Sequence, residues 1–381
     1  MLYRPLGKTG INLSVLGFGT LRLPEHESVK HRVDPDLSIK LMRHAFELGI
    51  NIVDTGYNYC GMDGEKIVGH ALRGWRHEVY LSSKSPSYLI KKPGDFTKYL
   101  KEQLHRMSLD YIDIYHLDGV NYQSVQEIEE NTGWLEEAQK AKEEGLIRFI
   151  SFYANGTPDD IKQLVNMGIF SSVLCSYNML DRLNEEAMEY AAKNGLGVII
   201  TNPLGGGAMA ELPDKFREQM DIKIRNNIEL GLRFVLANPD VSCMLSGMSC
   251  IEKLEENIFY AGNPTPLSGG DMIKIERVIN RLQKMADLYC TECRKCLPCP
   301  REVNIPYIFK LYKYLRVYEL EEIVQEAYKE LEVNPWIPGK NALSCYDCGL
   351  CEKKCPQEIK IMSQLKEAHK TLSTSRRKKL S

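Results

Sequence analysis

Eight of the twelve cysteines lie between residues 290 and 355, in two runs that each end in Cys-Pro, and this feature restricts the possible folds most strongly. The runs are Cys290, Cys293, Cys296 and Cys299, followed by Cys345, Cys348, Cys351 and Cys355. Thiolates at this spacing are typical ligands of [4Fe–4S] clusters, each of which takes four. Cys-x₂-Cys pairs also bind zinc, so two tetrahedral zinc sites are the alternative. The repeated step and the closing Cys-Pro favour iron–sulfur clusters.

The two ligand sets follow from the way in which such runs are usually shared. Three closely spaced cysteines bind one cluster, and the Cys-Pro cysteine binds the other. The first predicted set is Cys290, Cys293, Cys296 and Cys355, and the second is Cys345, Cys348, Cys351 and Cys299. Only Leu297 and Pro298 separate Cys296 from Cys299, one residue fewer than in the second run. This shortening leaves open whether the ligands are exchanged and whether the chain holds one cluster or two.

Composition and charge restrict the classes of partner. Lys and Arg total 49 against 51 Asp and Glu, which gives a net charge of -2 and no electrostatic basis for binding nucleic acid. The first residues lack the apolar core of a signal peptide, and no run reaches the ~20 apolar residues of a membrane helix. We therefore expect a soluble, cytoplasmic protein that acts on a small molecule. The scattered Cys60, Cys175, Cys243 and Cys250 are expected to be core thiols rather than disulfides.

Residues 1–265 alternate short apolar or β-branched runs with longer amphipathic segments, the pattern of repeated strand–helix units. The expected strands are 14–19, 51–54, 79–83, 111–116, 146–152, 172–176, 197–201 and 242–245. The expected helices are 36–48, 64–72, 95–107, 124–144, 158–167, 183–193, 219–237 and 250–260. Eight such units match a (β/α)₈ TIM barrel, an α/β fold of about 250 residues.

The Pro- and Gly-rich segment 261–270 marks the end of this barrel. We expect a barrel domain at 1–265 and an iron–sulfur domain at 266–381. Residues 304–332 lie between the two cysteine runs and have helical apolar spacing, so the second domain is expected to be an α-helical ferredoxin type. The basic end at 375–379 is expected to be a solvated, disordered tail.

Four polar side chains follow three neighbouring predicted strands. Asp54 ends the second strand and Tyr59 comes shortly after it, Lys84 follows the third, and His116 ends the fourth. Singly, such residues have ordinary explanations as a helix cap, a solvated loop charge or a satisfied core histidine. Active sites of TIM barrels lie where the strands end, so the four together predict a catalytic site.

In these residues and in several motifs, residues 1–262 resemble the aldo-keto reductase family, and the whole chain looks like its branch with a ferredoxin-type tail. The motifs are Leu-Gly-Lys-Thr-Gly at 6–10, Gly-Phe-Gly-Thr at 17–20, Ser-Tyr-Asn at 176–178, Asn-Pro-Leu-Gly-Gly-Gly at 202–207 and Ser-Gly-Met-Ser at 246–249. The resemblance implies that an aldehyde, ketone or sugar-like carbonyl is reduced to an alcohol by hydride from NADPH or NADH.

The resemblance also implies the roles of the four residues. Tyr59 gives its proton to the carbonyl oxygen, and the Lys84 ammonium, held by Asp54, lowers the pKa of the phenol from its usual ~10. His116 hydrogen-bonds the same oxygen and stabilises the developing negative charge. Family members with His at this position reduce carbonyls, whereas those that saturate an enone have Glu, so carbonyl reduction is expected.

The nucleotide is expected to lie along the same strand ends. The residues that the resemblance implies for it are Gly19, Thr20, Asp54, Tyr177, Pro203, Leu204, Gly205, Gly206, Gly247, Met248, Ser249, Lys253, Glu256 and Asn257. Lys253 supplies a cation where the family usually has arginine, whereas Gly247 stands where NADPH-specific members often have lysine. NADPH is therefore favoured over NADH only slightly.

Near the nicotinamide, the sequence departs from the family. Tyr153 and Ala154 replace a Ser-Asn pair, Leu174 replaces a glutamine, and Thr201 replaces a stacking aromatic residue. Either the carboxamide is held differently, or another cofactor, such as a flavin that links one- and two-electron steps, takes its place. The alternative function is an iron–sulfur electron-transfer or redox-sensing protein with a protein partner, in which the barrel only binds a nucleotide. A regulatory subunit of another protein is a third possibility.

Overall fold

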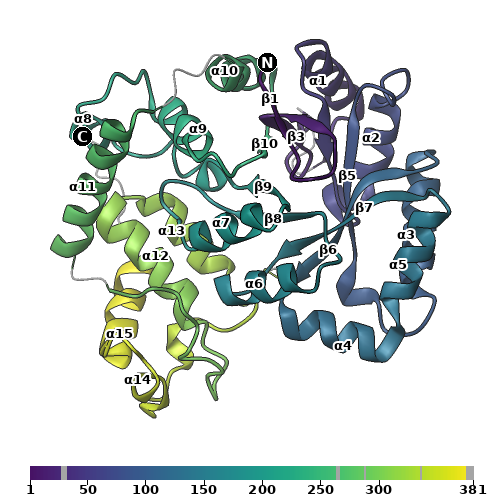
Figure 1. Ribbon diagram of the computed structural model, residues 1–381. Coiled ribbons are helices and arrows are strands. Elements are labelled where there is room, and N and C mark those ends of the chain that lie inside the picture. The colour runs from purple at the N-terminus through teal and green to yellow at the C-terminus, as the bar shows by residue number, and fades with distance from the viewer. Residues whose placement is uncertain (27–31, 263–266, 287–288, 335–336, 375–381) are drawn as a thin grey trace. The chain divides into compact units, whose positions relative to one another are not determined.

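Figure 1 shows the computed structural model of the chain, which describes residues 1–26, 32–262, 267–286, 289–334 and 337–374. Eight parallel strands close into a barrel in the order β10, β3, β4, β5, β6, β7, β8, β9. Their bounds are Leu16–Gly19 (β3), Ile52–Asp54 (β4), Tyr80–Ser85 (β5), Ile112–Val120 (β6), Ile147–Ala154 (β7), Ser172–Ser176 (β8), Gly197–Thr201 (β9) and Cys243–Gly247 (β10). The eight expected strands and the TIM-barrel fold are confirmed.

Helices connect the strands, mostly where the apolar spacing predicts them. They are α1 (Pro35–Glu47), α2 (Gly64–Ala71), α3 (Asp95–Met107), α4 (Tyr122–Thr132), α5 (Trp134–Glu143), α6 (Pro158–Asn166), α7 (Glu185–Lys193), α8 (Asp214–Glu218), α9 (Asn227–Ala237) and α10 (Ile251–Gly262). The expected helix 124–144 is divided at Gly133, whose left-handed φ of 64° ends α4. The expected helix 219–237 begins only at Asn227, as α9, and the short α8 lies before the expected range.

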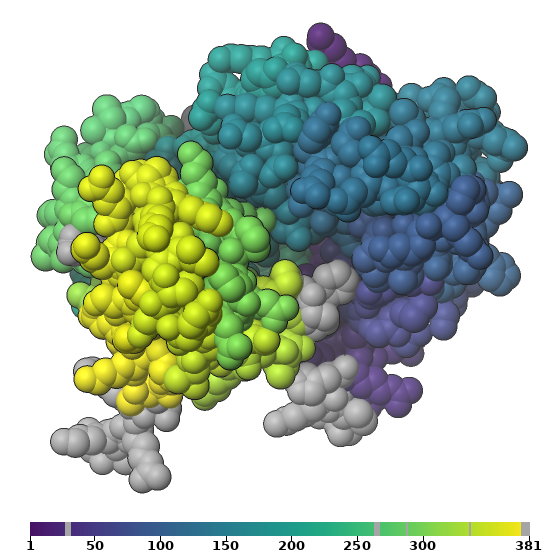
Figure 2. Space-filling view, turned by 90° about the horizontal axis from the view of Figure 1, so that it is seen from below, coloured from purple at the N-terminus to yellow at the C-terminus, as the bar shows by residue number. Residues whose placement is uncertain are grey.

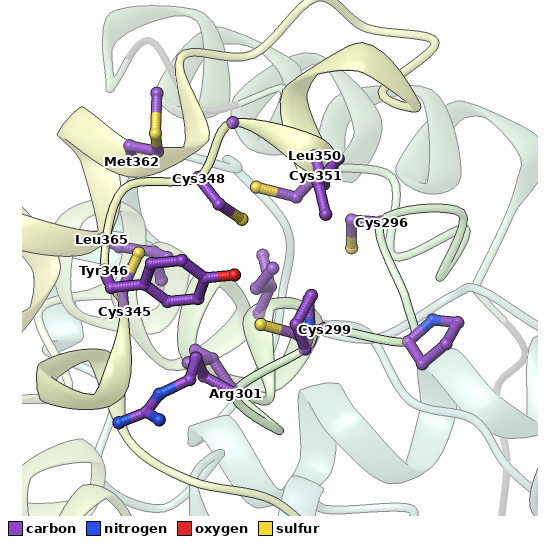
Figure 3. Close-up of a pocket in the computed structure, with 15 residues that line it drawn as sticks. Cys296, Cys299, Arg301, Cys345, Tyr346, Cys348, Leu350, Cys351, Met362 and Leu365 are labelled. Atoms are coloured by element: carbon purple, nitrogen blue, oxygen red, sulfur yellow. The ribbon is translucent and has the colours of Figure 1, made fainter.

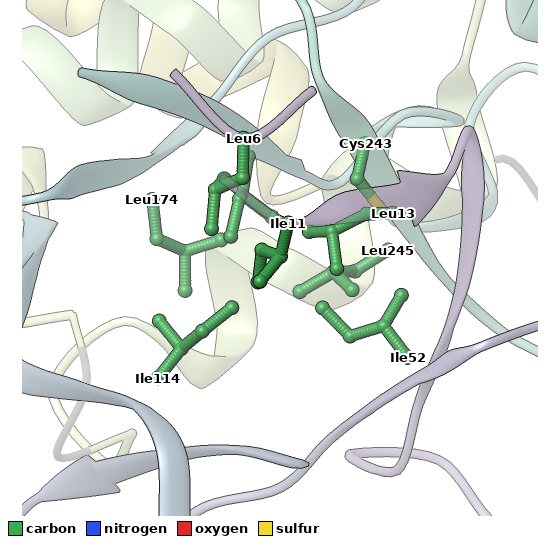
Figure 4. Packing of buried hydrophobic residues seen from close by; sticks show 9 residues of the cluster. Leu6, Ile11, Leu13, Ile52, Ile114, Leu174, Cys243 and Leu245 are labelled. Atoms are coloured by element: carbon green, nitrogen blue, oxygen red, sulfur yellow. The ribbon is translucent and has the colours of Figure 1, made fainter. Parts of the chain in front are cut away.

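An N-terminal hairpin that the sequence pattern did not predict closes one end of the barrel. Its strands, β1 (Tyr3–Pro5) and β2 (Asn12–Ser14), pair antiparallel. Leu6 and Leu13 of this segment pack with Ile52, Ile114 and Leu174 inside the barrel, as Figure 4 shows. The hairpin thereby completes an apolar base at the amino ends of the strands.

Strand alternation places a polar layer above this base. Ile52 and Ile114 belong to the apolar cluster, and Asp54 and His116 come two residues later on the same strands. Alternate residues of a strand point to the same face, so these polar side chains also point into the barrel. The carboxyl ends of the strands thus form a polar mouth over an apolar base.

The chain divides into two compact units, Met1–Gly206 with Ile228–Pro266, and Gly207–Asn227 with Leu267–Ser381. The second unit contains α11 (Gly269–Met285), α12 (Ile305–Tyr318), α13 (Glu321–Glu330), α14 (Leu350–Lys353) and α15 (Ile361–Leu372). In Figure 2, the yellow end of the described chain, with α14 and α15, lies on the near face of this unit. The expected α-helical character is confirmed, although Glu319, at a φ of 58°, divides the expected helix 304–332.

Segment 207–227 belongs to the second unit although it precedes α9 in the chain. Phe216 of α8 packs edge to face on Tyr318 with ring centres 5.6 Å apart, and Lys215 Nζ lies 2.7 Å from a Glu319 carboxylate oxygen. The local sequence pattern gave no sign of these distant partners. Part of the expected boundary, at 263–266, and the basic end at 375–379 lie outside the described residues.

Across the described ranges, every helix is too short or too polar to cross a lipid bilayer.

Candidate active site and cluster cavities

Three of the predicted catalytic side chains meet at the mouth of the barrel. Lys84 Nζ lies 2.6 Å from Asp54 Oδ2 and donates a second hydrogen bond of 2.8 Å to the Thr55 carbonyl oxygen. Tyr59, in the 3-10 turn η1 (Tyr59–Met62), places its ring centre 4.8 Å from the same nitrogen. Lys84 is 2% exposed and Asp54 is 4% exposed, so this ion pair is shielded from water.

The electrostatics of this group keep Tyr59 and Lys84 protonated. Burial lowers the pKa of Lys84, but Asp54, Tyr59 and Asp118 raise it, and the net shift is upward. Burial raises the pKa of Tyr59 to about 12, although Lys84 acts in the opposite direction. The expectation that Lys84 brings the phenol below its ordinary pKa is therefore wrong for this state, because desolvation outweighs the ammonium charge. Tyr59 is a fully protonated donor at neutral pH.

His116 lies one layer deeper, in a hydrogen-bond chain that sequence reasoning missed. Ser82 Oγ donates to Asp54 Oδ1 at 2.7 Å and lies 3.1 Å from His116 Nε2. Because the one hydroxyl proton of Ser82 goes to Asp54, we assign the proton of this second contact to His116 Nε2. His116 is fully buried, and burial, followed by Lys84, lowers its pKa to about 3, with the Phe152 backbone opposing. The imidazole is therefore neutral, and its Nε2–H is already hydrogen-bonded to Ser82 Oγ.

Asp118 is the second residue that the sequence analysis missed. It comes two residues after His116, where β6 shifts register between Leu117 and Val120, and its charge acts on the pKa of Lys84 and Tyr59. Burial raises the pKa of its carboxyl to about 6, Lys84 opposes this, and Asp54 adds to it. Within the described ranges, no hydrogen bond or ion pair reaches this carboxyl. The two-residue period of β5 was an available signal for Ser82, whereas Asp118 lies where β6 shifts register and gave no such signal.

Replacing Asp118 by Asn is expected to steepen the loss of stability in acid. The pKa of His116 is about 3 in the folded chain and 6.5 for the free group. Between pH 6.5 and 3 the unfolded chain therefore binds an extra proton at His116, and the free energy of unfolding decreases as the pH falls. The pKa of Asp118 is about 6 in the folded chain and 3.8 for the free group. Between pH 6 and 3.8 the folded chain therefore binds an extra proton at Asp118, which partly offsets the loss of stability caused by His116. The Asp118→Asn variant lacks this offset, so its free energy of unfolding should fall more steeply with decreasing pH, by up to about 1.4 kcal/mol per pH unit. Urea unfolding of both proteins at several pH values tests this, and parallel pH profiles would contradict it.

The residues that depart from the family pattern lie at different levels of the barrel. Burial raises the pKa of Tyr153, as does the charge of Asp118, while Lys84 and the Thr201 side chain oppose the shift. Tyr153 therefore lies close to the catalytic group, and Leu174 belongs to the apolar base below it. Ala154 pairs with Val120 at the end of the sheet.

Most residues expected at the nucleotide lie at the ends of β3, β9 and β10. Thr20 is fully buried and donates to the Asp54 carbonyl oxygen, and Asn257 of α10 donates to Ser246 Oγ at 3.1 Å. Lys253 Nζ lies 3.2 Å from Ser249 Oγ, at the start of the same helix. The other expected residues follow these strands in the chain, namely Gly19, Pro203, Leu204, Gly205, Gly206, Gly247, Met248 and Glu256.

The glycine turn after β9 leaves room for a ligand. Gly205 and Gly206 have left-handed φ values of 62° and 70°, and a Cβ built at Gly206 would meet only Arg22, at 3.9 Å. Arg22, which the sequence analysis did not select, donates to the Gly206 carbonyl oxygen at 2.8 Å. The backbone at Gly206 is therefore open to close approach by another group.

Tyr177 is a correction, because the structure does not bring it to the mouth. Its side chain is fully buried on the outside of the barrel, where its ring stacks on Phe234 of α9 at 5.7 Å. Its hydroxyl donates to Glu185 of α7 at 2.8 Å. The adjacent Ser176 ends β8, so alternation turns Tyr177 away from the interior.

The eight clustered cysteines surround two cavities of the second unit. One cavity is lined by Cys299, Cys345, Cys348 and Cys351, and also by Cys296, which lines both cavities. Figure 3 shows the sulfur atoms of Cys299, Cys348 and Cys351 turned toward the same space. The other cavity is lined by Cys290, Cys293, Cys296 and Cys355. Cys299 thus lies with the second run, and Cys355 lies with the first.

This grouping fits cubane clusters. A [4Fe–4S] cluster binds each thiolate through a different iron, so its ligands surround a volume instead of meeting at one point. Over the described residues, no three His, Cys, Asp or Glu side chains are arranged to hold a metal ion.

Comparisons with known proteins agree with both parts of the chain. Residues 15–280 match the Aldo/keto reductase family, and residues 289–360 match a 4Fe-4S dicluster domain. L-galactose dehydrogenase of Arabidopsis thaliana is 32% identical over 67% of this chain and 86% of its own length. NADH-specific methylglyoxal reductase of Escherichia coli is 29% identical over 67% and 91%. The holo form of aldo-keto reductase AKR11C1 from Bacillus halodurans superposes with a TM-score of 0.59 and 27% identity, over 73% of this chain and 96% of that protein.

Proposed function

Because the chain belongs to the aldo/keto reductase family and carries a 4Fe-4S dicluster domain, we propose that it is an NAD(P)H-dependent oxidoreductase that reduces an aldehyde, ketone or sugar-like carbonyl to an alcohol. The buried pair of Lys84 and Asp54 with the Tyr59 ring beside it is the observation that carries this proposal. The relatives named for L-galactose dehydrogenation and methylglyoxal reduction support it. In this proposal, residues 1–265 form the catalytic barrel and 266–381 form the iron–sulfur domain, in a cytoplasmic protein.

The residues of the mouth would supply the proton of the reaction. NAD(P)H, when bound, supplies hydride to the carbonyl carbon. Tyr59 gives its phenolic proton to the carbonyl oxygen, so that hydride and proton together yield the alcohol. The Lys84 ammonium stabilises the phenolate that remains, and Asp54 keeps Lys84 charged. The predicted contact of His116 with the carbonyl would require its Nε2 to leave Ser82.

The nucleotide would lie along the ends of β3, β9 and β10. Backbone groups of Gly19, Gly205, Gly206 and Gly247 allow the pyrophosphate to approach closely, since these positions have no side chain. The Lys253 cation, at the first turns of α10, would hold the adenosine phosphate. NADPH and NADH are both candidates.

The second unit would hold two [4Fe–4S] clusters that pass single electrons. The exchanged ligand sets fit the two cavities, with Cys355 joining the first run and Cys299 joining the second. An electron-transfer protein is then the expected partner, because a cluster carries one electron whereas a nicotinamide carries two as hydride.

A flavin-linked electron-transfer or redox-sensing protein is the second candidate. Leu174 and Thr201 favour this candidate, because they replace the glutamine and the aromatic residue that the resemblance implies as nicotinamide contacts. Release of FMN or FAD from denatured, cluster-loaded protein would support this candidate, whereas flavin-free purified protein would exclude it.

The test is NADPH and NADH oxidation by anaerobically purified protein over a panel of aldehydes, ketones and sugars. Nucleotide oxidation that depends on the carbonyl compound, with the matching alcohol as product, is the expected result. The reductase proposal fails if cluster-loaded protein binds nucleotide but turns over none of these carbonyls.

A further inference from the structure

We propose that Asp118 recognises the substrate, by accepting a hydrogen bond from a hydroxyl group on the carbon next to the carbonyl. The preferred substrates would then be α-hydroxy aldehydes and ketones, including open-chain sugars. This inference rests on the proposed carbonyl reduction and names its substrate class.

The position of Asp118 on β6 is the first argument. Ile114 and His116 are successive residues of the inward face of β6, and Asp118 follows two residues later, where β6 shifts register against β7 between Leu117 and Val120. Ile114 belongs to the apolar base, and His116 is bonded to Ser82. Asp118 thus follows the Lys84 layer toward the carboxyl end of the strand, since Lys84 pairs with His116 across β5 and β6.

The surroundings of Asp118 place it beside the proton donor. Its charge acts on the pKa of Tyr59, Lys84 and Tyr153, which lie on three other elements of the mouth. Its backbone is fixed, because Ser87 Oγ donates a hydrogen bond to the Asp118 carbonyl oxygen. Asp118 and Tyr59 therefore act on the same group of charges, and we infer that the Asp118 carboxyl reaches atoms that neighbour the reacting carbonyl.

The carboxyl itself has no partner among the described side chains. A partly buried carboxylate without a donor is costly, because it has lost water and gained no hydrogen bond. A substrate hydroxyl would supply that donor. The recognition would also be selective, because a substrate without the hydroxyl would leave the carboxylate unpaired.

The charges around Asp118 favour a neutral hydroxyl over an anion. A substrate phosphate or carboxylate would be repelled by Asp118, because the Lys84 ammonium is already paired with Asp54. The nearby loop groups are neutral hydrogen-bonding side chains, since Asn58 Nδ2 lies 2.5 Å from the hydroxyl of Tyr88, whose pKa also responds to Asp118. This wall of the mouth suits a hydroxylated, uncharged substrate.

The experiment compares pairs of substrates that differ only in this hydroxyl, glycolaldehyde with acetaldehyde and lactaldehyde with propanal. The ratio of kcat/KM within each pair is measured for the cluster-loaded full chain and for Asp118→Leu and Asp118→Asn. We expect Asp118→Leu to reduce the preference for the hydroxylated member by about 10- to 100-fold, the range for a hydrogen bond to a charged group. Asp118→Asn retains an acceptor oxygen and should keep part of the preference.

Asp240→Asn is the matched control, because this half-buried carboxyl lies just before β10, at the opposite end of the barrel. The Asp240→Asn variant should have the same substrate preference as the wild type. The inference is overturned if Asp118→Leu slows both members of a pair equally or leaves their ratio unchanged.

A binding measurement separates this inference from the proposed reaction. Saturation-transfer NMR with 1,2-propanediol and 1-propanol needs no turnover, and the wild type should bind the diol more strongly. Loss of this difference in Asp118→Leu would support recognition by Asp118 even if no carbonyl were reduced. Equal binding of the two alcohols by the wild type would overturn the inference while leaving the reductase proposal intact.

Discussion

Replacing Tyr59 by Phe is expected to lower kcat for carbonyl reduction by about 10²- to 10⁴-fold, the usual contribution of a positioned general acid. The ring would remain beside Lys84, because only the hydroxyl is removed, so its packing should be retained. The reduction in rate would therefore report the loss of the transferred proton. Steady-state kinetics with the best substrate of the panel measures this effect, and fluorescence titration with NADPH should show unchanged nucleotide affinity.

Tyr57→Phe is the control for this prediction. Tyr57 lies two residues earlier, and its hydroxyl donates to Glu102 at 3.3 Å instead of facing Lys84. The Arg106 guanidinium covers its ring at 4.2 Å. Loss of this hydroxyl should leave kcat within a few-fold of the wild type. If Tyr59→Phe retained a wild-type kcat, the proton would come from another group, and Asp118 would be the first to examine.

The barrel could be predicted from the sequence because its information is local. Each strand is a short apolar run, and the period of two also places Asp54 and His116 in the interior. The same period contained Ser82, but a serine in a strand gives no sign of function until its neighbours are known. Asp118 lies where β6 shifts register, which the period of two does not show. The pKa of Tyr59 was predicted in the wrong direction because burial, the larger effect, depends on packing that no local pattern shows.

Two other differences between the predicted and the observed structure also arise from packing that local sequence does not show. Tyr177 matches a motif, but its ring packs on Phe234, far away in the sequence. Segment 207–227 reads as part of a barrel connection, yet its Phe216 packs on Tyr318 of the second unit. In both cases a partner that is remote in sequence decides where the side chain lies.

Replacement of cysteines in the second unit is expected to cause the largest loss of bound iron. Replacing Cys290 by Ala should remove one cluster and about half of the bound iron, because a cubane needs four thiolates. Cys355→Ala should have the same effect if the Cys-Pro ligands are exchanged, since Cys290 and Cys355 line one cavity. Iron analysis and electron paramagnetic resonance of the reduced protein measure the loss. Cys250→Ala, outside both cavities, should retain all of the iron.

Double variants distinguish exchanged from unexchanged ligands. With exchange, Cys290→Ala with Cys355→Ala removes two ligands of the same cluster, so the double variant should lose no more iron than either single one. Cys290→Ala with Cys299→Ala then affects both clusters and should lose nearly all iron. Without exchange the two results are reversed, because Cys290 and Cys299 would share a cluster. The cavities predict the first pattern, since Cys299 lies with Cys345, Cys348 and Cys351. The reversed pattern would show that the shortened first run keeps its own fourth cysteine.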